Sequence, residues 1–305
     1  MTLRTFSIGI GLAGCIVACR QANVVARPTA LHLDSAVMFA PGVVSTGDVF
    51  ASTFTPDGKT VVFTKFSPPN PMTLMTSSFV NGSWTPPKAL PFSGSFRDLD
   101  PSFSPDGSRL YFSSARPSGP SPADTLTGVD TWFVDRQGTD WSAPVRLPSP
   151  INSIDADMYP SVTRRGSLYF DSARSRPSKR MVYRADLGSG VGAREPEPLG
   201  PMINADSGAS NLFVDPEERY VIFGAARPDG RGGLDLYISW RNSSDWTRPI
   251  NLGAAVNSEA VEFCPFVSRD GKTLYFTRIT TLSNKQVERN VFMVPFDADR
   301  FRPNR

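Results

Sequence analysis

The sequence predicts an all-β fold, a five-bladed β-propeller whose blades are four-stranded antiparallel sheets. Two observations carry this prediction: a hairpin-like segment recurs five times, and the same strand and turn signals follow most of its copies. The composition agrees, because 28 Pro and 24 Gly in 305 residues favour short strands joined by turns over long helices.

Each copy of the recurring segment consists of a strand, a tight turn and a second strand that closes on a phenylalanine. Asp-Gly in the turn supplies the positive φ that a tight hairpin requires. The third copy is one residue shorter in its turn, and the fourth is one residue longer and lacks the glycine. The closing residues, which stand 49, 58, 53 and 53 residues apart, are Phe63, Phe112, Phe170, Phe223 and Phe276. A period of about 50 residues falls within the range of propeller blades.

A third strand, a turn that begins with tryptophan and a short fourth strand follow the hairpins. The third strands begin at Asp130, Arg180, Asp235 and Asn290. The tryptophan turns are Trp84-Thr-Pro-Pro, Trp141-Ser-Ala-Pro and Trp246-Thr-Arg-Pro. The fourth strands end in Ile151-Asn-Ser, Ile203-Asn-Ala and Val256-Asn-Ser. Four strands per repeat make up the blade of a propeller.

The last copy stops after its third strand, near Phe301, and the missing strand is available at the other end of the chain. Residues 37–44 precede the first hairpin as residues 147–151 precede the third. We therefore expect an N-terminal strand to complete the last blade and close the ring, which removes exposed sheet edges. A sixth blade, the alternative, would need roughly 50 more residues. Residues 35–305 are predicted to form this single domain.

The N-terminus has the pattern of an exported protein. A short positive segment and an apolar stretch too short to span a bilayer make residues 1–18 a predicted signal peptide. The stretch contains two sites similar to the lipobox of bacterial lipoproteins, which end at Cys15 and Cys19. We predict that Cys19 is lipidated, with Cys15 as the alternative, and that residues 19–34 are a tether. An ordinary secretory signal stays open. A lipid would anchor the chain to a membrane without threading it through.

The repeat resembles a known family. S-P-D-G followed by L-Y-F-S-S-x-R, then G-x-D-x-Y, W-x-x-P and I-N-S, is similar to the TolB-like β-propeller repeat of bacterial envelope proteins. The resemblance covers nearly all of the mature chain and implies a periplasmic or outer-membrane protein that works through protein or glycan contacts. Arg20 follows Cys19, where a Gram-negative lipoprotein retained at the inner membrane would have Asp. We therefore expect a lipid anchor at the outer membrane facing the periplasm, with the cell surface or the soluble periplasm as alternatives.

Charged residues recur at the two ends of the hairpins. A cation follows each second strand and carboxylates precede most first strands, so both should lie near one rim of the central channel. The pattern has two interpretations: a charged funnel that binds a polar ligand, or arginine–carboxylate bridges between adjacent blades. The candidate binding residues at this rim are Lys65, Arg116, Arg174, Arg227, Arg278, Asp100, Asp157, Asp206 and Glu262.

These features predict a non-catalytic binding scaffold whose partner is an envelope protein, a peptide or a glycan. The chain is expected to be a monomer. Nucleic acid is not an expected partner, because 32 Lys+Arg nearly balance 29 Asp+Glu and no block of like charge occurs. The alternative is a carboxylate-dependent glycan hydrolase of the five-bladed propeller type, which needs two opposed acids. If each acid of the ring is bridged to an arginine, that alternative fails.

Residue counts exclude several other chemistries. The single histidine, His32, lies in the tether, which leaves no residue for a Ser-His-Asp triad in the repeats. Cys264 is the one cysteine beyond the N-terminal segment, so we expect a half-buried thiol and no internal disulfide. Metal sites with several His or Cys ligands are excluded as well. No cofactor is expected, and calcium bound by carboxylates and carbonyls is the one ion left open.

Departures from the repeat form a second set of site candidates, because a ligand site is usually asymmetric. Asp171 stands where other copies have Ser or Thr, and Arg164 and Arg165 replace Pro-Asp in the third turn. Trp132 and Trp240 lie outside the regular tryptophan positions and could be exposed stacking platforms.

Overall fold

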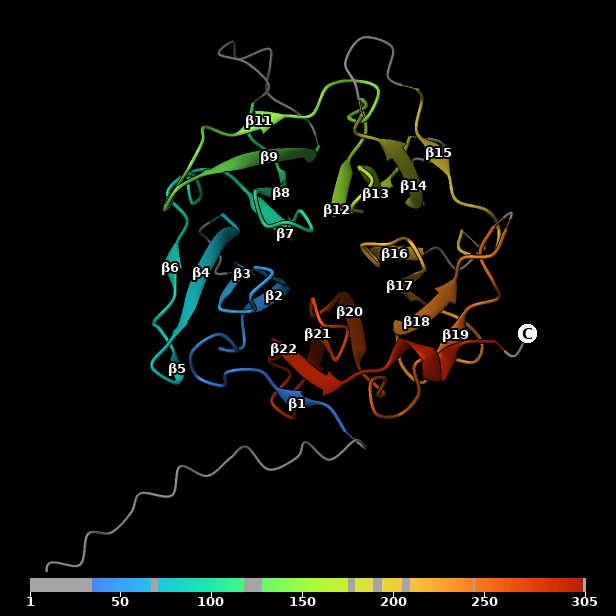
Figure 1. Cartoon of the computed structure of the whole chain (residues 1–305). Coiled ribbons are helices and arrows are strands. Elements are labelled where there is room, and N and C mark those ends of the chain that lie inside the picture. Colours follow the sequence, from blue (N-terminus) through green and yellow to red (C-terminus); the bar gives the residue numbers. More distant parts are fainter. Residues whose placement is uncertain are drawn as a thin grey trace, which may run out of the picture. The chain divides into compact units, whose positions relative to one another are not determined.

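The propeller prediction is confirmed by the computed structural model. The structure describes residues 35–66, 71–117, 128–174, 179–188, 194–204, 209–243 and 245–303. In these residues five antiparallel sheets surround a central axis, which decides for five blades over six (Figure 1). The predicted signal peptide and tether, with Cys15, Cys19 and His32, lie outside the described residues. Within the described ranges, no helix is long and apolar enough to cross a membrane.

The strands follow one another blade by blade. Blade 1 contains β2 (Val49–Phe54), β3 (Thr60–Lys65), β4 (Thr73–Val80), β5 (Ser83–Trp84) and β6 (Lys88–Ala89). Blade 2 contains β7 (Asp98–Phe103), β8 (Arg109–Ser114), β9 (Asp130–Gln137), β10 (Asp140–Trp141) and β11 (Val145–Arg146). Blade 3 contains β12 (Asp157–Val162), β13 (Ser167–Ser172), β14 (Met181–Asp186) and β15 (Glu197–Pro198). Blade 4 contains β16 (Ala209–Val214), β17 (Tyr220–Ala225), β18 (Asp235–Trp240) and β19 (Ile250–Asn251). Blade 5 contains β20 (Val261–Val267), β21 (Thr273–Thr281), β22 (Val287–Pro295) and β1 (Val37–Met38), and the 3-10 helix η2 (Ala298–Phe301) follows it.

The hairpin turns have the geometry that Asp-Gly predicts. Gly107 and Gly271 have φ of 74° and 73°, a region that glycine enters without steric cost. The preceding aspartate fixes the turn, since Asp106 Oδ1 accepts a hydrogen bond of 3.0 Å from the N–H of Ser108. Blade 4, which lacks the glycine, places Glu218 at φ 60° instead. The turn is therefore retained in the copy that departs from the sequence pattern.

The recurring asparagine after the fourth strand attaches that end of the blade to the third strand. Its side chain accepts a hydrogen bond from the backbone N–H of one third-strand residue and donates another to the same residue's carbonyl. The pairs are Asn152 with Thr131, Asn204 with Val182, and Asn257 with Leu236. This pair of hydrogen bonds explains why the motif needs an amide, which is both a donor and an acceptor.

The hydrophobic core lies in layers between neighbouring blades. Between blades 1 and 2, for example, Val62 and Leu74 pack with Phe112 and Trp132. Trp132 is buried in this layer, so the predicted stacking platform is wrong there.

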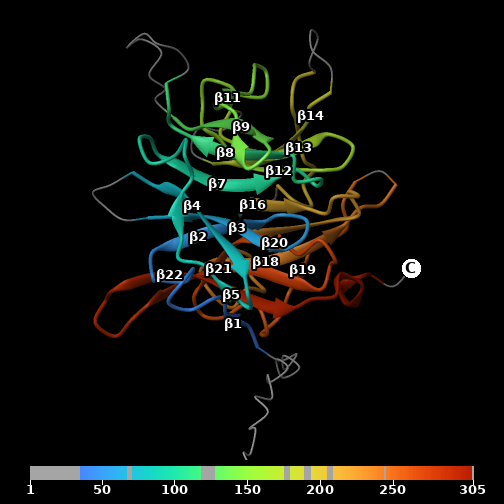
Figure 2. The ribbon, with the colours of Figure 1, turned by 60° about the vertical axis from the view of Figure 1, so that its left-hand side comes forward.

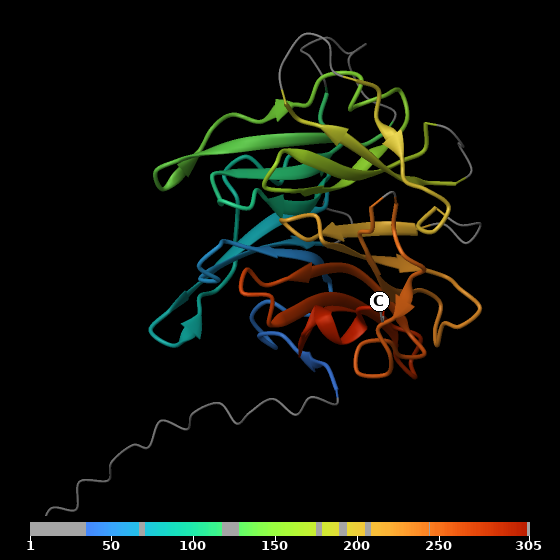
Figure 3. The same ribbon diagram turned by 45° about the vertical axis from the view of Figure 1, so that its right-hand side comes forward.

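The same prediction is wrong for Trp240, which the C-terminal segment covers. Its Nε1–H donates a hydrogen bond of 3.1 Å to the carbonyl of Phe301, at the end of η2. Arg302 lies over the same ring, 4.7 Å from its centroid. Figure 3 shows η2 in red, close to the C-terminal end of the described chain.

The ring is closed by the N-terminal strand, as the sequence predicts. β1 pairs with β22 on the outer edge of blade 5, with Val37 opposite Met293 and Met38 opposite Phe292 (Figure 2). The next residue, Phe39, donates its backbone N–H to the carbonyl of Val291 at 2.8 Å. Blade 5 therefore consists of strands from both ends of the propeller domain.

Replacing Phe39 by alanine should lower the free energy of unfolding by about 3–5 kcal/mol. Its ring is 5% exposed and makes edge contacts with Phe54, Trp84 and Tyr275 at centroid distances of 5.3–5.4 Å. Urea unfolding measures the loss, with Val37→Ala as the control because Val37 is exposed in the same segment. Equal losses in the two variants would contradict a closure that depends on the aromatic contacts.

Candidate functional site

The central channel is lined by one left-handed residue from each blade. In the middle of every innermost strand the register shifts at a β-bulge. The residues at these bulges are Ala51, Asp100, Tyr159, Asn211 and Cys264, with φ between 49° and 56°. Such φ values cost non-glycine residues on the order of 1–3 kcal/mol each, and bulges commonly turn a side chain toward a site. All five residues border the narrow waist of the channel, a cavity of about 50 Å³.

A chain of hydrogen bonds between blades holds this ring in place. The residue after each closing phenylalanine accepts a hydrogen bond from the backbone N–H of the left-handed residue in the next blade. The acceptors and donors are Thr64 and Asp100 (3.1 Å), Ser113 and Tyr159 (3.2 Å), Asp171 and Asn211 (3.0 Å), and Thr277 and Ala51 (3.0 Å). Blade 4 has Gly224 at this position, which has no side chain to accept such a bond. Asp171, a predicted departure from the repeat, therefore belongs to the ring.

Asp100 and Asp171 form a buried acid pair beside the waist. Both side chains are buried, and among the described residues neither oxygen of Asp100 nor Oδ1 of Asp171 has a hydrogen-bond partner. Burial raises the pKa of Asp171 to about 7, against the opposing effects of the Asn211 N–H and the charge of Arg180. Burial also raises the pKa of Asp100 well above its usual value, and the neighbouring Asp171 adds to the shift. Burial therefore disfavours the ionised form of both acids.

Cys264 faces the same environment. It is buried rather than half-buried, and burial raises the pKa of its thiol well above the usual range, with Asp100 and Asp171 adding to the shift. A thiol that stays protonated is a poor nucleophile. The structure thus agrees with an inert role for Cys264.

Four of the five rim cations predicted from the sequence form ion pairs among the described residues. The pairs are Lys65 with Asp48 (2.8 Å), Arg116 with Asp98 (2.8 Å), Arg174 with Asp157 (2.8 Å) and Arg278 with Glu262 (2.7 Å). Each pair lies within one blade, so the expected bridge between adjacent blades is wrong for these ion pairs. The reason is the register of the hairpin, which sets the start of the first strand opposite the end of the second. Asp206, the candidate partner of Arg227, lies outside the described residues.

The arginines do connect neighbouring blades, but through backbone carbonyls. Each arginine donates a hydrogen bond to a backbone carbonyl in the segment that connects the preceding blade to its own blade. The bonds run from Arg116 to Phe92 (3.3 Å), from Arg174 to Pro150 (2.9 Å) and Ile151, from Arg227 to Met202 (3.0 Å), and from Arg278 to Val256 (2.8 Å). These contacts give the rim cations a structural role, and ligand binding by them stays a prediction.

At the rim end the channel opens into a cavity of about 240 Å³, here called the rim-end cavity. Its apolar wall consists of Phe50, Phe66, Met72, Leu99, Met158, Phe263 and Ile279, and Tyr159 separates it from the waist. Arg97, Arg180 and Arg289 complete the lining. No recurring charge marks these three arginines in the sequence. Arg180 and Arg289 occupy the same place at the start of the third strand in blades 3 and 5, but the other blades have apolar residues there, and Arg97 precedes the first strand of blade 2.

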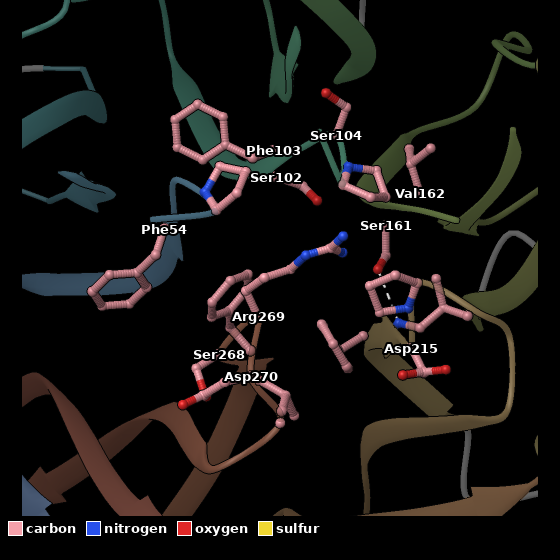
Figure 4. Close-up of a pocket in the computed structure, with 18 of the residues that line it drawn as sticks. Phe54, Ser102, Phe103, Ser104, Ser161, Val162, Asp215, Ser268, Arg269 and Asp270 are labelled. Atoms are coloured by element: carbon pink, nitrogen blue, oxygen red, sulfur yellow. Dashed lines mark hydrogen bonds between the residues drawn. The ribbon is translucent and has the colours of Figure 1, made fainter. Parts of the chain in front are cut away.

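The opposite end of the channel opens between the hairpin turns as a second cavity of about 160 Å³, the turn-end cavity. Phe54, Phe103 and Ser161 contribute to its wall, and Arg269 extends across it (Figure 4). Asp215, another lining residue, is paired with Arg219 at 2.9 Å. In the turn of blade 5, Arg269 occupies the position that proline has in blades 1 and 2.

The other two residues that depart from the repeat, Arg164 and Arg165, lie away from the channel waist. Arg164 pairs with Glu217 of the neighbouring blade's turn, and Arg165 lines a surface pocket beside it. Within the described part of the chain, no group of three or more His, Cys, Asp or Glu side chains is arranged to hold a metal ion.

Comparisons with known proteins agree with this architecture. No protein-family model matches the chain, and no curated protein sequence is significantly similar to it. TolB from Acinetobacter baumannii is 16% identical with a TM-score of 0.47, and the match covers 82% of this chain but 55% of that one. A protein from Agrobacterium tumefaciens assigned to TolB is 12% identical, with a TM-score of 0.52 and coverage of 83% and 92%. An α-L-arabinofuranosidase from Lactobacillus brevis is 13% identical, with a TM-score of 0.50 and coverage of 85% and 94%. The second and third of these likenesses show a shared fold, and identities this low show nothing beyond it.

Proposed function

We propose that this chain is a non-catalytic binding module of the TolB-like propeller type, which binds an anionic group of its partner at the rim end of the channel. The observation that carries the proposal is the rim-end cavity. Arg97, Arg180 and Arg289 line it, and none of them forms an ion pair with a carboxylate of the described chain. Unpaired charges of one sign in a cleft attract and orient a partner of the opposite sign. An envelope protein, a peptide or a glycan could supply that group.

A glycan hydrolase has less support. Glycosidases place two carboxyl groups on either side of the bond they cleave. Asp157 and Glu262 are each held by an arginine, and Asp100 is buried beside a waist of about 50 Å³. A space of that size holds about one or two water molecules and cannot admit a sugar ring. Asp206, the fourth candidate acid, lies outside the described residues.

The proposed location is the cell envelope. The signal-like segment and the lipobox-like sites at Cys19 and, alternatively, Cys15 support export and lipid anchoring. We place the anchor at the outer membrane facing the periplasm. A partner for the rim-end cavity would then be a component of the same compartment.

Capture of a partner from solubilised envelope tests the proposal. The purified protein should retain a partner in a saturable manner, and a variant with Arg97, Arg180 and Arg289 all changed to Gln should retain at least tenfold less. Arg97 and Arg180 are exposed and Arg289 is half-buried, so this variant should fold normally. Arg231→Gln is the matched control, because Arg231 lies on an exposed loop outside the cavity. Equal capture by the triple variant, or no saturable capture by the wild type, would refute the proposal.

A further inference from the structure

We propose that the rim-end cavity binds a carboxylate that is attached to a compact apolar body. This inference rests on the proposed function and names the chemistry of the group that the site recognises. Four features of the cavity lead to it: its unpaired guanidinium groups, the state of the acids beneath them, its apolar wall, and the scarcity of other polar groups.

The guanidinium groups at the cavity are not neutralised locally. Nη1 of Arg180 donates a hydrogen bond of 3.0 Å to the sulfur of Met158, which is a weak acceptor. Arg289 lies over the ring of Phe66, 5.2 Å from its centroid. Arg97 is exposed at the entrance to β7. Four of the five cations predicted at this rim, by contrast, have carboxylate partners among the described residues.

Burial weakens the opposing charge of the acids beneath the cavity. Asp100 interacts electrostatically with both Arg97 and Arg180, and Asp171 interacts with Arg180. Burial raises the pKa of both acids, and Asp171 further raises that of Asp100. Both shifts disfavour the ionised carboxylates. The two acids therefore compete less with an incoming anion for the three positive groups than two ionised carboxylates would.

The wall of the cavity suits an apolar body. The rings of Phe50 and Phe263 are stacked with centroids 6.1 Å apart, and Met72, Leu99 and Ile279 extend this surface. Each square ångström of apolar surface that a ligand buries here contributes roughly 25 cal/mol. A carboxylate fits the planar donor fork of arginine, which can bind both of its oxygens at once.

The cavity is poorly suited to an uncharged sugar. Among the described residues of the lining, Tyr159 has the one polar side chain beside the three guanidinium groups. A polyol bound against this wall would leave hydroxyl groups without hydrogen-bond partners, which costs binding energy. The lining therefore selects an anion with few polar groups apart from its charge.

Calorimetric titration of the purified protein at pH 7 with a matched set of probes tests this inference. We expect 3-phenylpropionate to bind, and 3-phenylpropanol, 3-phenylpropylamine and acetate to bind at least tenfold more weakly. The alcohol lacks the charge, the amine reverses it, and acetate lacks the apolar body. Equal affinity for the alcohol would overturn the requirement for an anion, and equal affinity for acetate would overturn the requirement for an apolar body. No binding of 3-phenylpropionate at millimolar concentration would overturn the inference as a whole.

Variants of the arginines locate the binding. Arg180→Gln should weaken the affinity for 3-phenylpropionate by about tenfold or more, as expected for losing a charge-assisted hydrogen bond. Arg231→Gln should leave the affinity unchanged, and an equal effect of the two variants would overturn the assignment to this cavity. N-acetylphenylalaninate, titrated in parallel, separates two sources of the same chemistry. Tighter binding of this probe points to the C-terminal residue of a peptide, and tighter binding of 3-phenylpropionate points to a free organic acid.

The probes and the capture experiment can fail independently. If the arginine-dependent capture of a partner succeeds while no probe binds, the chemistry inferred here is wrong and the proposed function stands. If the capture fails for the wild type, the proposed function is wrong whatever the probes show.

Discussion

Replacing Asp171 by asparagine is expected to raise the free energy of unfolding at pH 8 by about 4 kcal/mol, with little effect near pH 4. The carboxyl is fully buried, and its burial raises the pKa from 3.8 to about 7. In the folded state the proton is therefore retained to about pH 7, whereas the unfolded chain releases it near pH 4. The stability that this proton contributes is fully present below the unfolded pKa and is lost as the pH rises through the folded pKa. Asparagine has no such proton to lose.

The amide also preserves the contacts of the site. Its oxygen can accept the hydrogen bond that Asp171 Oδ2 accepts from the N–H of Asn211. The titratable groups that interact electrostatically with Asp171, namely Asp100 and Arg180, keep their own side chains. The expected gain comes from the removed ionisation rather than from new packing.

Urea unfolding at intervals from pH 4 to pH 8 measures this effect. The difference between Asp171→Asn and the wild type should grow with pH. Asp270→Asn is a control of opposite sign, because Ser268 and the Lys272 N–H lower the pKa of that exposed turn acid. A constant difference over the whole range would mean that Asp171 is ionised in the folded protein at acidic pH, which would contradict the prediction.

Replacing Arg116 by alanine is expected to lower the free energy of unfolding by about 3–5 kcal/mol, because the change leaves a buried charge without its partner. The guanidinium is 8% exposed and its partner Asp98 is fully buried, with 2.8 Å between Nη2 and Oδ1. The change also removes the hydrogen bond to the carbonyl of Phe92, which connects blade 2 to the segment from blade 1. Ser114 and Ser93 retain their hydrogen bonds to the two oxygens of Asp98, but neutral hydroxyl groups do not replace the lost positive charge.

Lys65→Ala is the matched control within the same repeat. Its pair with Asp48 occupies the corresponding place in blade 1, but the two side chains are 35% and 32% exposed. Exposed pairs contribute about 0–1 kcal/mol, so this variant should lose little stability. The double variant Arg116→Ala with Asp98→Asn should recover part of the loss, since the unpaired charge is then absent. Equal losses for Arg116→Ala and Lys65→Ala would contradict the structural role of the buried pair.

The sequence predicts the fold because the fold is repetitive. The spacing of the closing phenylalanines, the Asp-Gly turns and the Ile-Asn motif each have a geometric cause that recurs in most blades. Even closure by an N-terminal strand could be expected, since the last copy lacks a fourth strand. Asp171 could be recognised for the same reason, as an acid in a position of hydroxyl side chains.

The channel could not be predicted in the same way. The left-handed residues at the bulges share a backbone conformation but no residue type, since they include Ala51, Tyr159 and Cys264. Asp100 and Asn211 are of residue types that favour a positive φ, but the other three side chains give no such signal. In the rim-end cavity, Arg180 and Arg289 share a repeat position that the other three blades fill with apolar residues, so no recurring charge marks it. Arg116, one of the charges that recur most regularly in the sequence, is buried in the structure.

The closure of the ring also determines where a mechanical load would enter the propeller. Any tension on the chain before residue 35 reaches the domain through β1, which has two residues and is exposed. Such a short strand offers little resistance to being peeled from β22. The load then meets Phe39, whose ring is enclosed by Phe54, Trp84 and Tyr275 from blades 1 and 5. Peeling can therefore stop at Phe39, so that a pull on the chain before β1 loosens the outer edge of one blade before it strains the channel.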